Sequence, residues 1–318
     1  MNRGARLALG GLAGLLAVAG PAPARRSLQA EHAPLRAVVL GIAQDGGVPH
    51  IGCQQELCVS ARADPTRRQR VAALGLIDEA ADRRFLIDAT PDVGLQLEAL
   101  NQGRPSVDRA RPVDGILLTH AHIGHYTGLM YLGREALGAH RVPVYATPRM
   151  AGFLRGNGPW SQLVALEQIE IRELSPGHPL QLSPGLRVTP RLVPHRGEWS
   201  DVVGFRVEGR QRTLLYVPDI DAWEAWDEPL EAAVAGVDVA VLDGTFEEAS
   251  ELPGRSREEI PHPLVRDTAA RLLAARLAER TIFIHLNHTN RLLWDAHARA
   301  GLEAQGFRIA HEGLELRL

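Results

Sequence analysis

Three histidines lie within six positions of the segment THAHIGHYTG, residues 119–128. His120 and His122 are two residues apart, and His125 follows three residues later. A helix aligns side chains three or four residues apart, whereas alternate residues of an extended chain point the same way. The spacing therefore predicts a loop that leaves a strand and turns into a helix near Tyr126.

Neutral imidazoles that converge in this way are ligands for Zn²⁺, Fe or Mn²⁺. We therefore expect a metal centre, with Zn²⁺ as the expected ion and Fe or Mn²⁺ as alternatives. The competing interpretation is a run of surface histidines. The apolar strand-like run before the segment and the Thr-Gly after it favour the metal centre.

Short apolar segments surround these histidines and are separated by fewer helical ones. The expected strands are residues 35–43, 73–79, 84–89, 113–120, 142–147, 186–195, 202–208, 213–219, 237–244, 281–286 and 307–313. The expected helices are residues 94–102, 126–137 and 263–279. Two blocks of strands with helices between them predict a layered α/β fold, with sheet packed on sheet and helices outside. Because no Gly-, Pro- or Ser-rich linker divides residues 35–318, we expect one domain there.

The composition limits the partners of the protein. The chain has 318 residues, of which 45% are hydrophobic, and a net charge of −3. It is long enough to bury a sizeable core. No basic stripe interleaved with aromatic residues is present, so the expected partner is a small-molecule substrate rather than a nucleic acid. The sequence carries no clear mark of the oligomeric state.

The N-terminus resembles a secretory signal. Arg3 and Arg6 precede the apolar run LALGGLAGLLAVAG, and Ala22–Ala24 offers small residues to a signal peptidase. The alternative, a membrane anchor, needs roughly 20 apolar residues, and the run is shorter. We expect a signal peptide at residues 1–24, a linker at residues 25–34, and a periplasmic or secreted protein with no stable membrane anchor. Cleavage removes two arginines and no acidic residue, which changes the net charge from −3 to about −5.

The histidine segment resembles the T-H-x-H-x-D-H signature of the metallo-β-lactamase superfamily, whose fold is a four-layer αββα sandwich. Three later residues follow in the order of that family, each after an apolar strand. His195 resembles the third histidine of the first metal site, and Asp219 resembles the aspartate that bridges two metals. His285 resembles the last histidine of the second site. The resemblance implies a hydrolase that uses a metal-bound hydroxide.

A narrower resemblance covers nearly the whole mature chain. The segments GIAQDGGVPHIGCQQELC, LIDATPDV, YVPDID, VAVLDGTF and IFIHLNHTN resemble the coenzyme PQQ (pyrroloquinoline quinone) synthesis protein B family. That family is related to the cyclic phosphodiesterases of phosphonate breakdown. Its typical members lack the first two histidines of the signature and keep the aspartate, whereas this sequence does the reverse. The departure favours a hydrolytic paralogue.

The resemblance implies two adjacent metal sites that share Asp219. The first would use His120, His122, His195 and Asp219. The second would use His125, Asp219 and His285, but Gly124 stands where the family has an aspartate. Loss of that carboxylate removes one ligand and one negative charge, so we expect one tight metal and a second that is weak or absent. The alternative is that Gly124 opens space for substrate.

Proton transfer is assigned to two residues by the same resemblance. Asp219 is expected to orient the hydroxide and accept its proton. His262, in EEIPHPLV, stands where related hydrolases place a histidine beside the pocket, and is expected to donate a proton to the leaving group. The alternative is a histidine that starts a helix between two prolines. Asp88 and Asp243 are expected to support the site, Asp88 by orienting a histidine ligand.

Cys53 and Cys58 follow a glycine-rich turn. In the resembling families this cluster contains a further cysteine and helps to bind a structural zinc, but Gln55 occupies the middle position here. With His50 and His288 the two cysteines would form a Cys2His2 zinc site, which is the favoured expectation. Export favours instead a disulfide between the only two cysteines, and free thiols are the third alternative.

The function that the sequence favours is that of an exported metal-dependent hydrolase acting on a phosphoester, lactone or amide. One alternative is an iron-dependent, oxygen-using participant in PQQ biosynthesis or transport. Another is a noncatalytic metal-binding relative, because a fold does not fix an activity. Iron content and dioxygen uptake separate the first alternative from a hydrolase.

Overall fold

A computed structural model describes residues 1, 34–104, 106–251 and 260–318 of the chain. The predicted signal peptide, apart from its first residue, and the predicted linker up to residue 33 lie outside the described residues. Within the described ranges, no helix is both long enough and apolar enough to cross a membrane.

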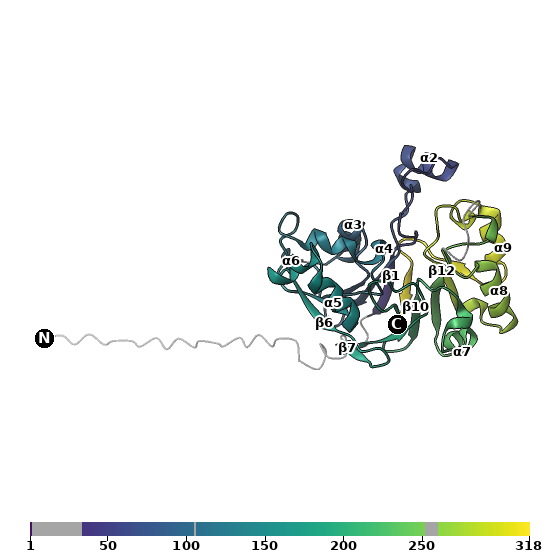
Figure 1. Cartoon of the computed structure of the whole chain (residues 1–318). Helices are drawn as coiled ribbons and strands as arrows, with labels where there is room; N and C mark the ends of the chain where they lie inside the picture. Colours follow the sequence, from purple (N-terminus) through teal and green to yellow (C-terminus); the bar gives the residue numbers. More distant parts are fainter. Residues whose placement is uncertain (2–33, 105, 252–259) are drawn as a thin grey trace.

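Two seven-stranded sheets face each other, and helices cover their outer sides (Figure 1). The first sheet has the order β14 (Glu315–Arg317), β1 (Leu35–Gly41), β2 (Ala73–Asp78), β3 (Arg83–Ile87), β4 (Gly115–Leu117), β5 (Val142–Ala146) and β6 (Ile169–Glu173). The second has the order β13 (Arg308–Ile309), β12 (Thr281–Ile284), β11 (Val239–Asp243), β10 (Thr213–Val217), β9 (Val203–Glu208), β8 (Leu186–Leu192) and β7 (Leu180–Ser183). This arrangement confirms the predicted four-layer αββα sandwich in a single domain.

The helices follow the two halves of the chain. Those of the first half, on the side of the first sheet, are α3 (Val93–Leu100), α4 (Ile123–Tyr126), α5 (Pro148–Gly156) and α6 (Trp160–Ala165). Those of the second half are α7 (Leu230–Ala235), α8 (Val265–Ala274) and α9 (Ala296–Glu303). The 3-10 turns within the described residues are Pro65–Arg67, Thr127–Leu132, Trp223–Ala225, Ala249–Glu251, Ala278–Arg280 and Arg291–Leu293.

Helix α8 shows how the sequence produces this packing. Its buried residues, Val265, Thr268, Ala269 and Leu272, recur at the i, i+3, i+4, i+7 spacing of one helical face. Strands β11 and β12 are buried at every residue, because a neighbouring sheet and helices cover both of their faces. Such strands read as continuous apolar runs, which is why the sequence revealed them.

Parallel pairing positions the functional residues. Strands β3 to β6 of the first sheet pair in parallel, and so do β10 to β13 of the second. The carboxyl ends of parallel strands lie at one edge of a sheet, where α/β proteins bind their ligands. Asp88, His120, Asp219 and His285 all follow such ends. The fold therefore brings residues from both halves of the chain to one place.

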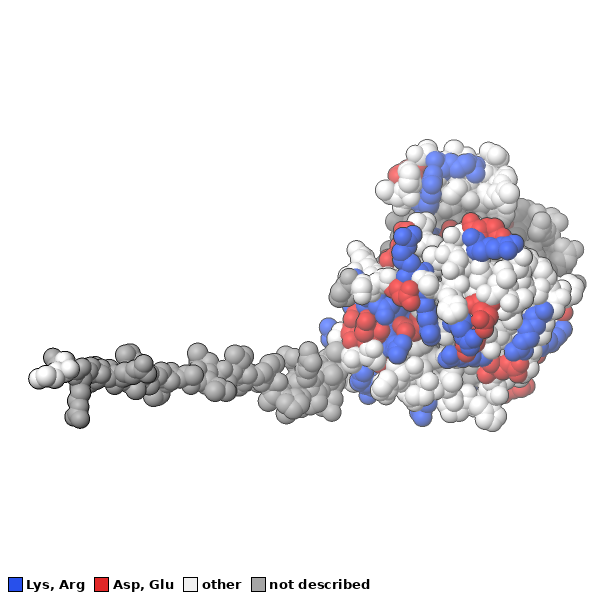
Figure 2. Space-filling view, turned by 90° about the vertical axis from the view of Figure 1, so that its left-hand side faces the viewer, with Lys and Arg blue, Asp and Glu red and all other residues white. Residues whose placement is uncertain are grey.

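Residues 42–72 leave the first sheet between β1 and β2 and are called the arm below. The arm carries α2 (Glu56–Ala63) away from the body of the molecule (Figure 1). Its base is fastened to the loop after β12, because the Gln44 amide donates to the Leu286 carbonyl (2.9 Å) and the Leu286 amide donates to the Ile42 carbonyl (2.8 Å). On the face of the molecule in Figure 2, basic and acidic side chains are intermixed without a continuous basic stripe.

Candidate metal centre

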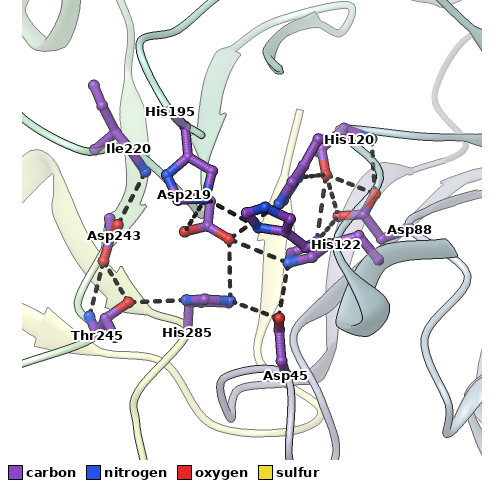
Figure 3. A network of polar contacts seen from close by, with 12 residues as sticks. Asp45, Asp88, His120, His122, His195, Asp219, Ile220, Asp243, Thr245 and His285 are labelled. Atoms are coloured by element: carbon purple, nitrogen blue, oxygen red, sulfur yellow. Dashed lines mark hydrogen bonds and ion pairs between the residues drawn. The ribbon is translucent and has the colours of Figure 1, made fainter. Parts of the chain in front are cut away.

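The Asp219 carboxylate lies among histidines at the edge where the two sheets meet (Figure 3). The residue follows β10 and is buried, with 3% of its surface exposed. Its Oδ2 is 3.4 Å from His120 Nε2 and 3.3 Å from His125 Nε2, while its Oδ1 is 3.4 Å from His195 Nε2. The carboxylate thus lies between two groups of donor atoms, which we call the first and the second ligand group, and its Oδ2 is close to members of both.

The first ligand group consists of His120, His122, His195 and Asp219. The first two come from the loop after β4, and His195 comes from the loop after β8. His122 Nδ1 lies 3.2 Å from His195 Nε2. One donor atom from each of the four residues lies within 4.8 Å of the others. The structure therefore assembles all four residues that the sequence assigned to the first site.

The second ligand group consists of Asp45, His125, Asp219 and His285. Asp45 Oδ1 is 3.2 Å from His125 Nε2 and 3.5 Å from His285 Nε2. His285 Nε2 is also 3.5 Å from Asp219 Oδ2. Asp45 is the member of these two ligand groups that sequence reasoning missed. It follows the apolar strand at residues 35–43, which is the same signal that identified the other ligands.

The position of Asp45 corrects the prediction made for Gly124. A Cβ atom on Gly124 would lie 2.3 Å from Asp45 Oδ1, so the Asp45 carboxylate fills the space beside the glycine. The expectation that the second group offers only three donor residues is wrong, because Asp45 places a fourth donor atom beside the other three. The alternative that Gly124 opens space for substrate is also wrong in this structure.

The donor atoms fit a metal ion in each group. Four ligands at zinc distances of about 2.0–2.1 Å in a tetrahedron lie about 3.3 Å from one another. The distances above, from 3.2 to 3.5 Å, match this spacing. Five of the donor atoms are buried and have no hydrogen-bond partner within the described part of the chain: His120 Nε2, His125 Nε2, His285 Nε2, Asp45 Oδ1 and Asp219 Oδ1. An unsatisfied buried polar atom costs about 1–3 kcal/mol, and a bound cation would remove that cost.

The electrostatics of the groups also suit a cation. Burial lowers the pKa of His120 well below its usual value, which favours the neutral imidazole that binds metals. Burial would raise the pKa of Asp219, but the neighbouring charges of His285 and His195 outweigh it and hold that pKa well below its usual value. Burial would also lower the pKa of His125, but the carboxylates around it raise it well above its usual value.

Two threonine relays orient the histidines. Thr119 Oγ1 donates to Asp88 (2.9 Å) and accepts from Nδ1 of His120 (3.0 Å), while His125 Nδ1 donates directly to Asp88 Oδ2 (2.8 Å). Each of these Nδ1 atoms carries its proton toward an acceptor, so the Nε2 lone pair is left for a metal. Asp88 makes the orienting contact predicted for it and is not itself a ligand.

The second half of the chain repeats this device. Thr245 Oγ1 donates to Asp243 Oδ1 (2.7 Å) and accepts from His285 Nδ1 (2.9 Å). His195 Nδ1 donates to Asp221 Oδ1 (2.6 Å). Asp243 therefore has the supporting role predicted for it, whereas sequence reasoning identified neither Asp221 nor the threonines.

The backbone turns sharply at two of these positions. Asp88 has φ 70° directly after β3, and His285 has φ 64° directly after β12. Left-handed conformations of non-glycine residues cost about 1–3 kcal/mol and are concentrated at functional sites. Here the turns direct both side chains into the centre instead of along the strand.

His262 lies in the centre as well as before α8. Its Nδ1 is 2.8 Å from Asp243 Oδ2 and 3.4 Å from Asp219 Oδ1, and the residue is buried. Burial would lower the pKa of His262, but Asp243 and Asp219 raise it to about 9. The histidine therefore combines the two positions that the sequence left open, beside the centre and at the start of a helix.

The predicted Cys2His2 zinc site is not formed in this structure. Cys53 and Cys58 are joined by a disulfide, with their Cα atoms 6.0 Å apart. His50 and His288 do lie together, with stacked rings whose centroids are 4.1 Å apart. The two sulfur atoms that the site needs are bonded to each other, so neither thiolate is available to a metal.

A cavity of about 480 Å³ lies between the arm and the loops after β11 and β12. Its described lining includes Gln44, His50, Phe246, Asn287 and His288. Phe246 also packs edge-on against the ring of His262, with centroids 5.7 Å apart. Phe246 thus links the wall of the cavity to His262, although the described lining includes no residue of either ligand group.

The fold and the centre place the chain in a known class. A family model described as the beta-lactamase superfamily domain matches residues 83–286, which is most of the domain. Among solved structures, the crystal structure of a new diphosphatase from the PhnP family shares the fold, with a TM-score of 0.64, 23% identity and coverage of 89% of this chain and 97% of that one.

Within this superfamily, similarity extends over the whole domain. Coenzyme PQQ synthesis protein B of Methylorubrum populi is 30% identical over 307 residues, which cover 89% of this chain and 100% of the relative. The crystal structure of Zn(2+)-bound PqqB from Methylobacterium extorquens has a TM-score of 0.75 and 26% identity, with coverage of 89% and 100%. The chain belongs to the coenzyme PQQ synthesis protein B family of the metallo-β-lactamase superfamily.

Proposed function

We propose that the protein is an exported metal-dependent hydrolase that acts on a phosphoester, lactone or amide. The observation that carries the proposal is the convergence of five histidines and two aspartates in two ligand groups that share Asp219. The family to which the chain belongs includes a zinc-bound member, and the donor set here suits the same ion. Zinc is the proposed metal.

A divalent ion in the first group supplies two things when bound: a water with a pKa near neutrality and polarisation of a substrate oxygen. The chain itself supplies orientation and proton transfer. Asp219, buried between both groups, orients the attacking water and accepts its proton. Asp243 holds the Nδ1 proton of His262, so proton donation to a leaving group would come from Nε2. The raised pKa of His262 keeps this ring protonated at neutral pH in the metal-free protein.

The test is turnover by the zinc-loaded protein on a panel of phosphodiesters, lactones and anilides. We expect at least one substrate to be hydrolysed, and we expect His120→Ala to abolish that activity. His262→Ala should lower kcat by about 10²–10⁴-fold, the usual contribution of a general acid. His297→Ala, at an exposed position on α9, is the matched control and should leave kcat unchanged. A fully loaded protein with no turnover above the His120→Ala variant would support a noncatalytic role instead.

A second candidate is a role in PQQ biosynthesis or transport, as an iron-dependent oxygenase-like protein. The similarity to proteins named coenzyme PQQ synthesis protein B over 89% of the chain favours it. This candidate predicts iron in the purified protein and uptake of dioxygen with a PQQ precursor. Zinc alone, with hydrolysis and no dioxygen uptake, would reject it.

Export is part of the main proposal and is supported by the N-terminal sequence. The expected cleavage after Ala24 makes Arg25 the first residue of the mature protein. N-terminal sequencing of protein from the periplasm or the medium tests this. A cytoplasmic protein that retains the first 24 residues would contradict it.

A further inference from the structure

We propose that Asp45 is the carboxylate ligand of the second metal, supplied by the arm in place of the aspartate of the family signature, and that Gly124 exists to make room for it. The inference deepens the proposed function, because it completes the metal centre on which the hydrolase proposal rests. It replaces the expectation of a weak or absent second metal with a second site that is complete.

The base of the arm delivers Asp45 to His285. The backbone bonds between the Leu286 region and residues 42–44 hold the chain beside the last histidine of the centre. A turn follows directly, closed by the Gly47 amide donating to the Gln44 carbonyl (2.8 Å), and Asp45 is its second residue. Gly47 has φ 64°, a conformation that glycine adopts without strain. The turn therefore directs Asp45 into the centre, as Figure 3 shows below His285.

Gly124 and Asp45 are sterically linked. A Cβ on Gly124 would lie 2.3 Å from Asp45 Oδ1, 2.7 Å from its Cγ and 2.8 Å from its Cα. Because the backbone Cα is among these atoms, rotation of the Asp45 side chain cannot relieve the clash. Any side chain at position 124, including the aspartate of the family signature, therefore excludes Asp45 from its present place.

The backbone gives no other reason for a glycine at this position. Gly124 lies within α4 and its φ is not in the left-handed region. A glycine inside a helix is about 1 kcal/mol less favourable than alanine. Space for Asp45 explains why a helix-destabilising residue stands at the centre of the histidine motif.

The exchange preserves the charge of the second group. With Asp45, the group has two imidazoles and two carboxylates, one of which is the Asp219 carboxylate that it shares with the first group. Asp45 Oδ1 is buried and has no hydrogen-bond partner among the described residues, although it lies 3.2 Å from His125 Nε2 and 3.5 Å from His285 Nε2.

The first test is zinc binding by the full-length protein, measured by calorimetric titration and elemental analysis without substrate. We expect the wild type to bind two zinc ions per chain. Asp45→Ala should lose one ion or bind it at least about 100-fold more weakly, since loss of a mere orienting partner already costs 10–100-fold. Glu56→Ala removes an exposed carboxylate from the same arm and should still bind two ions.

The second test uses the steric link. Gly124→Ala removes no ligand, yet it should weaken the second ion as Asp45→Ala does, and it should have no further effect in the Asp45→Ala background. Gly152→Ala, a helical glycine with open space around it, is the matched control. The double variant Asp45→Gly with Gly124→Asp should restore binding of two ions, because it returns the carboxylate to the position that the family signature uses.

Three results would overturn the proposal: one ion per wild-type chain, two ions of wild-type affinity in Asp45→Ala, or an unchanged second ion in Gly124→Ala. Thermal unfolding of each variant after chelation of metal checks that the fold is intact. The double variant tests the proposal by a gain of zinc binding, which a misfolded protein would not show. The proposed function fails separately. A wild type that binds two ions by way of Asp45 but hydrolyses nothing would retain this inference and reject the hydrolase.

Discussion

The two ligand groups share Asp219 but differ in the segments of the chain that build them. In the first group, the side chain of His122 is 17% exposed and its Nε2 lies 3.1 Å from Glu198 Oε2, at the surface. In the second group, Asp45 is likewise 17% exposed, whereas His125 and His285 are almost completely enclosed. Each group therefore has one ligand that reaches the surface, His122 in the first and Asp45 in the second. Only the second depends on the arm.

The two groups also differ in the carboxylates that orient their histidines. Asp88 serves both, since it contacts His125 directly and reaches His120 through Thr119. Asp221 contacts only His195 of the first group. The two groups thus share Asp219 and the orienting carboxylate of Asp88, whereas Asp221 supports the first group. Substitutions can therefore distinguish residues that serve both groups from residues that serve one.

The largest effect is expected at the shared bridge. Asp219→Asn keeps the size of the side chain but removes the charge that faces both groups, so both ions should be lost and activity with them. Zinc content per chain after dialysis is the measurement. Retention of an ion in either group would show that the two groups do not depend on a common carboxylate.

Substitution of a ligand that belongs to only one group should remove one ion and leave the other. His122→Ala should abolish the ion of the first group and leave the second, whereas His285→Ala should do the opposite, because each offers a donor to one group only. Anomalous diffraction at the zinc edge identifies which position is empty in each variant. Loss of both ions from either variant would mean that the groups bind metal only as a pair.

Orienting carboxylates should produce intermediate effects. Asp88→Asn is expected to weaken both ions by about 10–100-fold, while Asp221→Asn should weaken only the first to a similar degree. Competition with a chromogenic chelator measures the two affinities in each variant. The shared role of Asp88 would be refuted if Asp88→Asn lowered the affinity of the first group as much as Asp221→Asn does but left the affinity of the second group unchanged.

The sequence predicted the strands that position the ligands because those strands are buried and apolar. The strands that it missed, β6, β7 and β14, are all edge strands, and the Ile169–Glu173 segment of β6 is polar and mostly exposed at its end. The helix predicted for residues 126–137 is instead the short α4 followed by a 3-10 turn over Thr127–Leu132. A Cβ on Gly128 would lie 1.9 Å from the Thr90 carbonyl, so close packing with that loop shapes this segment.

The residues of the candidate site also differ in how readily the sequence predicts them. His120, His122 and His125 are neighbours in the chain, and His195, Asp219 and His285 follow apolar strands in a familiar order, so local patterns were sufficient. Asp45 also follows a strand, but its partner Gly124 is distant in the sequence and only the fold brings them together. The disulfide was one of the open alternatives, and only the structure pairs the two cysteines. Local patterns therefore identify ligands more readily than the spatial exchange of one ligand for another.

The smallest effect is expected from the disulfide of the arm. Cys53 and Cys58 are five positions apart, and the chain-entropy estimate for so short a loop is about 2 kcal/mol. Cys53→Ser should therefore lower the stability of the arm and, through Asp45, weaken the second ion by a few-fold while the first is unchanged. Hydrogen exchange in residues 42–72 and zinc titration, each with and without reductant, measure this. An equal loss of affinity for both ions would show that the arm supports the whole centre, and dependence on the arm would then no longer distinguish the second group from the first.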